Sequence, residues 1–198
     1  MNVKIDLNDI LEKRKKVFDN KKTELDKLKD KLSLSNPIEF SISDIEIPNS
    51  KKKGKKVGIK ALNSLENIKC PVIYIYEIVD TSIKSELLDR IAKFRSKDKK
   101  DENGKDLTRS TSKIPKDAKT NTTNVLYVGS VEKDIHLRTK QHLGFGNPHT
   151  FALQLNHWAK NDWGFKFYYI EVTNKQILTD IEAQISKELN PLVGKREK

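Results

Sequence analysis

Apolar residues at the start of the chain recur with the spacing of a long helix. Residues 6–32 contain neither Gly nor Pro, and Leu11, Phe18 and Leu25 follow one another at intervals of seven residues. Such a stripe within an otherwise charged segment predicts an amphipathic helix. Pro37 lies just beyond it, where a helix cannot continue.

Two interpretations of this helix stay open. A seven-residue repeat is typical of a coiled coil, which would pair two copies of the chain as a homodimer. However, Arg14 and Lys21 occupy positions that a coiled-coil seam fills with apolar residues. We therefore favour a helix that packs its apolar stripe on the rest of the protein.

Apolar runs farther along the chain predict strands. The most regular is residues 72–79, Val-Ile-Tyr-Ile-Tyr-Glu-Ile-Val, and further strands are expected over 124–130 and 165–172. All three are rich in β-branched and aromatic residues, which favour strands. One or two short strands are also expected within 38–47, where apolar residues alternate.

Helices are expected between these strands. Helical spacing of apolar residues predicts them over 61–68, 82–94 and 150–160, the last with Phe151 and Trp158 facing inward.

Two further helices carry end signals. Asp134 is a candidate N-cap for a helix that runs to Leu143, and Gly144 is its candidate C-terminal stop. Thr173 and Gln176 predict a capping box for the last helix.

These elements predict an α/β chain of the α+β type. Its domain is a small three-stranded antiparallel sheet flanked by helices, preceded by the long N-terminal helix. We assign 1–56 to the helix and a basic linker, and 57–198 to the folded domain. Polar composition indicates that about 80–123 is an insertion made of a helix and a long loop.

Composition adds an anionic partner to this picture. The 198 residues include 39 Lys and Arg against 28 Asp and Glu, a formal charge of +11, which favours binding to phosphates. A single cysteine excludes an intrachain disulfide and suits a reducing compartment. No segment resembles a signal peptide or the roughly 20 apolar residues of a membrane span. We therefore expect a cytoplasmic protein with no membrane partner.

Five polar side chains on separate predicted elements have the chemistry of a hydrolytic site. Arg138 and His142 are four residues apart on one helix, so they project from the same face. Tyr127 lies on the strand that leads into that helix, and Tyr74 lies on the first strand. Glu182 borders the apolar side of the last helix, an unusual place for an acid. Phosphodiester hydrolysis needs a base, an Arg on the phosphate and a carboxylate for a divalent metal ion.

Two short motifs resemble those of the GIY-YIG nuclease superfamily. Residues 71–74, Pro-Val-Ile-Tyr, resemble the first motif, and residues 126–130, Leu-Tyr-Val-Gly-Ser, resemble the second. An Arg with a His four residues later, a Glu on the final helix and a Pro-containing tail follow in the order of the family. The resemblance covers residues 70–195.

The resemblance implies a role for each of the five side chains. Tyr74 would accept a proton from the attacking water, directly or through a network, and Tyr127 would support it and contact the phosphate. Arg138 would stabilise the transition-state charge, and His142 would orient or relay the proton. Glu182 would hold a single divalent cation, Mg²⁺ in the first place and Mn²⁺ as the alternative.

The implied activity is that of an endonuclease that hydrolyses DNA, with basic residues along the DNA backbone. These are Lys51, Lys52, Lys53, Lys55 and Lys56 in the linker, and Arg109, Lys113 and Lys116 in the insertion.

Two departures from the family pattern keep other functions open. Val72 stands where the first motif has glycine, and the insertion separates the two motifs. One alternative is a DNA-binding module of the same fold that does not cleave. Another is a partner-binding protein in which the N-terminal helix is the working part.

Overall fold

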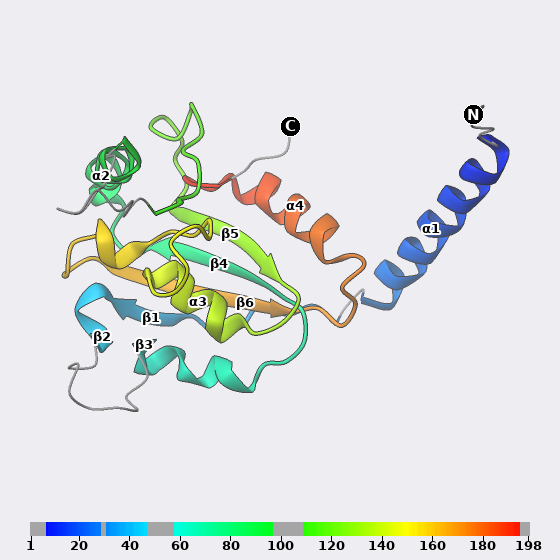
Figure 1. Ribbon diagram of the computed structural model, residues 1–198, viewed down its shortest axis with the longest axis horizontal. Coiled ribbons are helices and arrows are strands. Elements are labelled where there is room, and N and C mark those ends of the chain that lie inside the picture. Colours follow the sequence, from blue (N-terminus) through cyan, green and yellow to red (C-terminus); the bar gives the residue numbers. More distant parts are fainter. Residues whose placement is uncertain (1–6, 29–30, 47–57, 97–108, 195–198) are drawn as a thin grey trace.

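The computed structural model describes residues 7–28, 31–46, 58–96 and 109–194. They form a mixed fold of helices and strands around a four-stranded antiparallel sheet with the order β1-β6-β4-β5 (Figure 1). Its strands are β1 (Ile38–Ser41), β4 (Val72–Ile78), β5 (Val125–Val131) and β6 (Gly164–Glu171). The α-helices are α1 (Leu7–Leu28), α2 (Lys84–Ser96), α3 (Ile135–Leu143) and α4 (Leu178–Leu189). The expected α+β class is confirmed.

The sheet has one strand more than the three that the sequence predicts. The three are present as β4, β5 and β6, and β1 adds a fourth on the outer side of β6. Phe40 of β1 is buried and stacks on Phe165 of β6, with 5.6 Å between the ring centroids. A two-stranded ribbon of β2 (Ile45–Glu46) and β3 (Gly58–Ile59) follows β1.

The sheet separates two layers of buried side chains, because successive strand residues point to opposite faces. Tyr74 and Tyr76 lie on one face, fully buried with Phe167 of β6. Ile73 and Ile75 lie on the other face, where α4 covers the sheet. The tyrosine face therefore holds the candidate residues of β4.

A bulge in β5 adjusts the alternation beside these tyrosines. Tyr76 pairs with Tyr127 but Glu77 pairs with Val125, so Leu126 is the extra residue. Tyr127 keeps the regular register opposite Tyr76, on the same face as Tyr74. The bulge adds Leu126 to that face, where it packs in the tyrosine layer.

The end signals predicted for α3 are confirmed. The Asp134 carboxylate accepts a hydrogen bond from the backbone N–H of Leu137 at 2.9 Å. Gly144 ends the helix with a φ of 107°, a left-handed conformation that glycine adopts without strain.

Two other predicted helices take partly different forms. The helix predicted over 61–68 is present as a 3-10 helix, η2 (Lys60–Asn67), instead of an α-helix. The helix predicted over 82–94 is present as a single 3-10 turn, η3 (Thr81–Ile83), followed by α2.

The helix predicted over 150–160 is wrong. Only a 3-10 turn, η4 (Leu155–His157), forms there. The Leu153 N–H donates to Nδ1 of His142 at 3.1 Å, and Gln154 has a left-handed φ of 60°. Both features prevent a continuous helical ladder. Trp158 is buried as predicted, but Phe151 is exposed.

The capping box predicted for the last helix is also wrong. The helix begins later, at Leu178, with no side-chain cap on Ile177. The Asn174 side chain instead organises the preceding loop, since its Oδ1 accepts a hydrogen bond from the Gln176 N–H at 2.8 Å.

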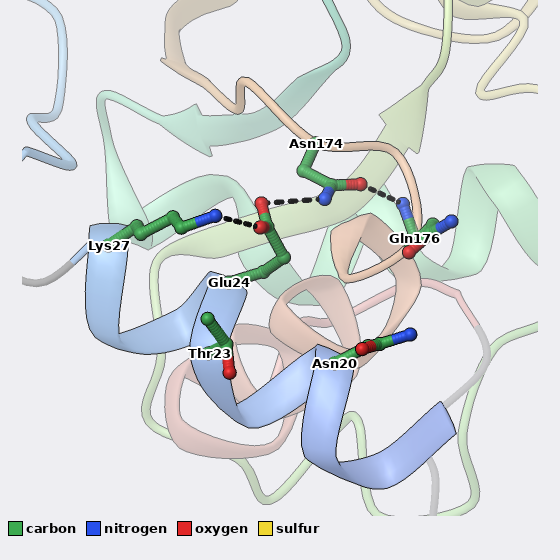
Figure 2. Close-up of a pocket in the computed structure, with 6 residues that line it drawn as sticks. All are labelled: Asn20, Thr23, Glu24, Lys27, Asn174 and Gln176. Carbon is green, nitrogen blue, oxygen red and sulfur yellow. Dashed lines mark hydrogen bonds and ion pairs between the residues drawn. The ribbon is translucent and has the colours of Figure 1, made fainter. Parts of the chain in front are cut away.

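Helix α1 extends away from the sheet and contacts the rest of the fold near its C-terminal end (Figure 1). Leu28 is buried in the layer under α4, and Lys21 pairs with Asp180 at 2.6 Å. Figure 2 shows the Glu24 carboxylate between Lys27 and the Asn174 amide, which donates to it at 2.8 Å. These contacts attach α1 to the loop that precedes α4.

The apolar stripe of α1 does not pack on the domain as predicted. Leu11, Val17, Phe18 and Leu25 are all exposed, because the helix leaves the domain within two turns of Leu28. None of the described helices combines the length and the apolar content needed to cross a membrane.

Candidate functional site

The hydroxyl of Tyr74 is the centre of the polar cluster on the tyrosine face. It lies 2.9 Å from Nε2 of His142 and 2.9 Å from Nε of Arg138. Both partners come from α3, one helical turn apart, as their spacing predicted. Strand β4 and helix α3 are thus joined through one buried oxygen atom.

The hydrogen bonds of His142 determine its tautomer. Its Nδ1 accepts from the backbone N–H of Leu153, and a backbone N–H can only donate. In the neutral ring, the proton therefore resides on Nε2 and is donated to Tyr74. Burial, together with the charge of Arg138, holds the pKa of His142 well below its usual range.

Arg138 donates three hydrogen bonds to its surroundings, and its side chain stays partly exposed to solvent. Nε donates to Tyr74, Nη1 donates to Gln141 at 3.0 Å, and Nη2 donates to the carbonyl of Phe151 at 3.0 Å. Burial lowers the pKa of Arg138, but its interactions with Tyr74 and Tyr127 outweigh this and raise it. The guanidinium is consequently a fixed positive charge at the surface of the cluster.

Tyr127 packs against the buried rings of the cluster. Its ring stacks on Tyr74 with 6.2 Å between centroids and lies 5.0 Å from the His142 ring. It interacts with Arg138 and with Ser112 from the end of the insertion. Tyr127 is only half-buried, so it is accessible where Tyr74 and His142 are not.

Gly129 makes room for both tyrosine rings. It pairs directly with Tyr74 across the two strands. A Cβ atom at this position would lie 2.6 Å from Cε1 of Tyr127 and 2.7 Å from the Tyr74 hydroxyl. No side chain fits there, which gives the glycine of the second motif a steric reason.

The environment of Tyr74 opposes loss of its proton. Burial raises its pKa, and the neighbouring Tyr127 and Glu182 act in the same direction. Arg138 acts in the opposite direction, because its positive charge and its hydrogen bond favour the phenolate. Burial is the larger effect, so Tyr74 is a neutral phenol at neutral pH.

Glu182 reaches the cluster from α4. Ser130, the residue after Gly129, points to the α4 side of β5 and donates a hydrogen bond to the Glu182 carboxylate. The carboxylate raises the pKa of Tyr127 and of Tyr74, although burial is the larger cause for each. Glu182 therefore acts electrostatically on the tyrosine pair from the opposite side of the edge strand.

The site offers one carboxylate for a metal ion. Within the parts of the chain that the structure describes, no three His, Cys, Asp or Glu side chains gather closely enough to form a metal cage. Mg²⁺ keeps several water ligands and commonly uses one or two carboxylates together with substrate phosphates. Partly exposed Glu182, oriented by Ser130, fits such an ion.

The basic residues predicted to contact DNA have different positions. Lys51, Lys52, Lys53, Lys55 and Lys56 lie outside the described residues. Lys113 and Lys116 are exposed. Arg109 is partly buried and donates to the Gln154 side chain at 3.2 Å, so it also has a structural contact.

Several residues that support the cluster were not predicted from the sequence. Gln141 holds Arg138 from three residues away on the same helix, and that spacing was the available signal. Ser130 stands out in the sequence only as the last residue of the second motif. Nothing in the sequence indicated that the 150–154 segment would bond to both Arg138 and His142. The neighbouring His136 is buried as well, with its Nδ1 3.2 Å from the Glu66 carboxylate.

The structure thus brings Tyr74, Tyr127, Arg138 and His142 together and places Glu182 at their edge. Such a group can bind an anion through the guanidinium and the Tyr127 hydroxyl. Comparisons of the chain with family models, with curated proteins and with solved structures give no match.

Proposed function

We propose that this chain is a metal-dependent endonuclease that hydrolyses DNA phosphodiester bonds. The observation that carries the proposal is the Tyr74 oxygen, which accepts hydrogen bonds from both Arg138 and His142 beside the half-exposed Tyr127. Three hydrogen bonds fix the orientation of the guanidinium, so it is preorganised to bind a phosphate. The net charge of +11 supports a polyanionic substrate.

In the proposed reaction a water oxygen bonds to phosphorus, one P–O ester bond breaks, and the leaving oxygen gains a proton. Arg138 stabilises the negative charge that builds up on the phosphate oxygens. Tyr127 donates to the same phosphate, and His142 keeps Tyr74 and Arg138 in place. Glu182 would hold a divalent cation, which supplies further positive charge at the phosphate.

The resemblance gives Tyr74 the role of final proton acceptor, reached through a network because its side chain is fully buried, and only the phenolate, a minor species at neutral pH, can take up that proton. The two N–H donors favour the phenolate that this role requires. Burial works against it, and the same observation favours the alternative of a DNA-binding module without cleavage.

The proposal is tested by separating cleavage from binding. Arg138→Ala and Glu182→Ala should each reduce cleavage at least about a thousandfold and change DNA affinity less than about tenfold, since these groups act mainly in the transition state. Cleavage is followed on supercoiled plasmid, and affinity by fluorescence anisotropy with a labelled duplex.

Lys140→Ala on α3 and Glu188→Ala on α4 are the matched controls. Lys140 matches Arg138 in helix and in positive charge, and Glu188 matches Glu182 in helix and in negative charge. Neither side chain contacts Tyr74, so each variant should cleave DNA like the wild type. Equal loss of binding and cleavage in all four variants would contradict the proposal.

A further inference from the structure

Phe151 carries an exposed aromatic ring and directly contacts Arg138, the arginine of the proposed phosphate site. Its side chain is 65% exposed, although sequence spacing predicted that it would face the core. Its backbone carbonyl accepts the hydrogen bond from Nη2 of Arg138 at 3.0 Å. The ring therefore belongs to the residue that fixes the guanidinium.

The backbone that carries this ring is fastened at several points. Ala152, Leu153 and Gln154 are buried directly after it. The Leu153 N–H donates to His142, and Ala152 pairs with Thr111 of the insertion in a parallel bridge. A segment held this firmly can orient an exposed ring relative to Arg138, so its exposure is not the result of a loose loop.

The charge and the ring together match the two ends of a nucleotide. A nucleotide carries an anionic phosphate on one side of its sugar and a flat aromatic base on the other. Arg138 suits the phosphate, and an accessible phenyl ring suits the face of the base, because stacking on aromatic side chains is a common way to hold unpaired bases.

We propose that Phe151 stacks on an unpaired nucleobase next to the phosphate that Arg138 binds. This inference rests on the proposed nuclease function and narrows its substrate class. It selects DNA in which a base near the cut site is free to leave its pair, such as a single strand, a flap or a mismatch. A fully paired duplex offers no face to the ring.

The test uses full-length protein with Glu182→Ala, which is expected to bind DNA without cutting it. The probe is a short oligothymidylate with 2-aminopurine at alternate positions, whose fluorescence falls when the modified base stacks. Adding Phe151→Ala to this protein should abolish the quenching and weaken binding about tenfold, on the order expected for loss of one base–aromatic contact. Phe151→Tyr keeps a ring and should retain both.

The control is Leu34→Ala, which truncates another exposed apolar residue, in the segment before β1, and should change neither signal. Equal quenching and equal affinity with and without the Phe151 ring would overturn the inference, even if the wild type cuts plasmid. Absence of any binding by the Glu182→Ala protein, together with absence of cutting by the wild type, would overturn the nuclease proposal as well.

Discussion

At the scale of single residues, the cluster depends on one phenol oxygen that accepts two hydrogen bonds. Arg138 and His142 meet there because residues four apart project from the same face of α3. That spacing is visible in the sequence, and so these residues could be predicted as a pair. The reason for Gly129 could not, since it depends on the Tyr74 ring from the neighbouring strand and on the Tyr127 ring two residues earlier on its own strand.

Adding a methyl group at Gly129 should displace both tyrosines. We expect Gly129→Ala to lower the free energy of unfolding by about 1–3 kcal/mol, as in other overpacked cores, and to abolish most cleavage. Gly58→Ala is the matched control, because the nearest atom to a Cβ there is 3.8 Å away. Urea unfolding and plasmid cleavage of both variants provide the comparison, and a fully active Gly129→Ala protein would refute this steric role.

Removing one hydroxyl from each of two neighbouring tyrosines should have different effects. Tyr74→Phe removes the shared acceptor of Arg138 and His142 and should destabilise the fold by about 1–3 kcal/mol. Among the described residues the buried Tyr76 hydroxyl has no hydrogen-bond partner, so Tyr76→Phe should leave stability unchanged within about 0.5 kcal/mol. Urea unfolding measures both, and equal losses for the two variants would contradict the assigned contacts.

The buried, neutral His142 should make the fold sensitive to acid. Its pKa is lowered in the folded state, so the unfolded chain binds a proton first as the pH falls below about 6.5. The stability that His142 contributes is therefore complete above that pH and declines below it, by up to about 1.4 kcal/mol per pH unit.

The measurement is the free energy of unfolding between about pH 7.5 and pH 5. The wild type should lose more stability over this range than His142→Gln, which cannot titrate. His149→Gln, at an exposed histidine, should follow the wild type. Parallel pH profiles for wild type and His142→Gln would show that the histidine is not buried in its neutral form.

At the scale of elements, the parts of the fold with strong local signals were predicted well. Strands β4, β5 and β6 are rich in β-branched and aromatic residues, and α3 has a cap at each end. Prediction failed where a tertiary contact competes with local preference. The 150–160 segment has helical spacing, yet its backbone bonds to His142 and Arg138 instead.

The contact between β5 and α4 should determine how well the site holds a cation. Ser130→Ala removes the donor that orients the Glu182 carboxylate, and loss of such a supporting bond commonly weakens metal affinity about 10- to 100-fold. We expect a corresponding rise in the Mg²⁺ concentration for half-maximal cleavage and in the dissociation constant for Mn²⁺ by calorimetry. Ser130→Thr retains the hydroxyl and should restore both, whereas wild-type values for Ser130→Ala would remove the orienting role.

At the scale of the whole molecule, the projecting helix α1 leaves an apolar face uncovered. The contacts around Lys21, Glu24 and Leu28 attach its C-terminal part to the domain (Figure 1, Figure 2). The seven-residue repeat and the exposure of Leu11 and Phe18 support a proposed homodimer through α1. Two subunits would also supply two active sites for the two DNA strands.

Charged residues on this face should separate the subunits. Leu11→Lys with Phe18→Lys keeps residues that favour a helix but should convert a dimer into a monomer in sedimentation equilibrium. Leu34→Lys changes an exposed apolar residue outside α1 and should leave the dimer intact. A wild type that sediments as a monomer at tens of micromolar would contradict pairing through α1.

The proposed function is hydrolysis of DNA at the Tyr74–Arg138–His142 cluster with a cation at Glu182. Its most direct test is nicking of supercoiled plasmid by the purified full-length protein, with and without Mg²⁺, beside Glu182→Ala and Glu188→Ala. We expect nicking by the wild type and Glu188→Ala only when Mg²⁺ is present, and none by Glu182→Ala. Absence of nicking by the wild type with Mg²⁺ and with Mn²⁺, on single-stranded as well as duplex DNA, would contradict it.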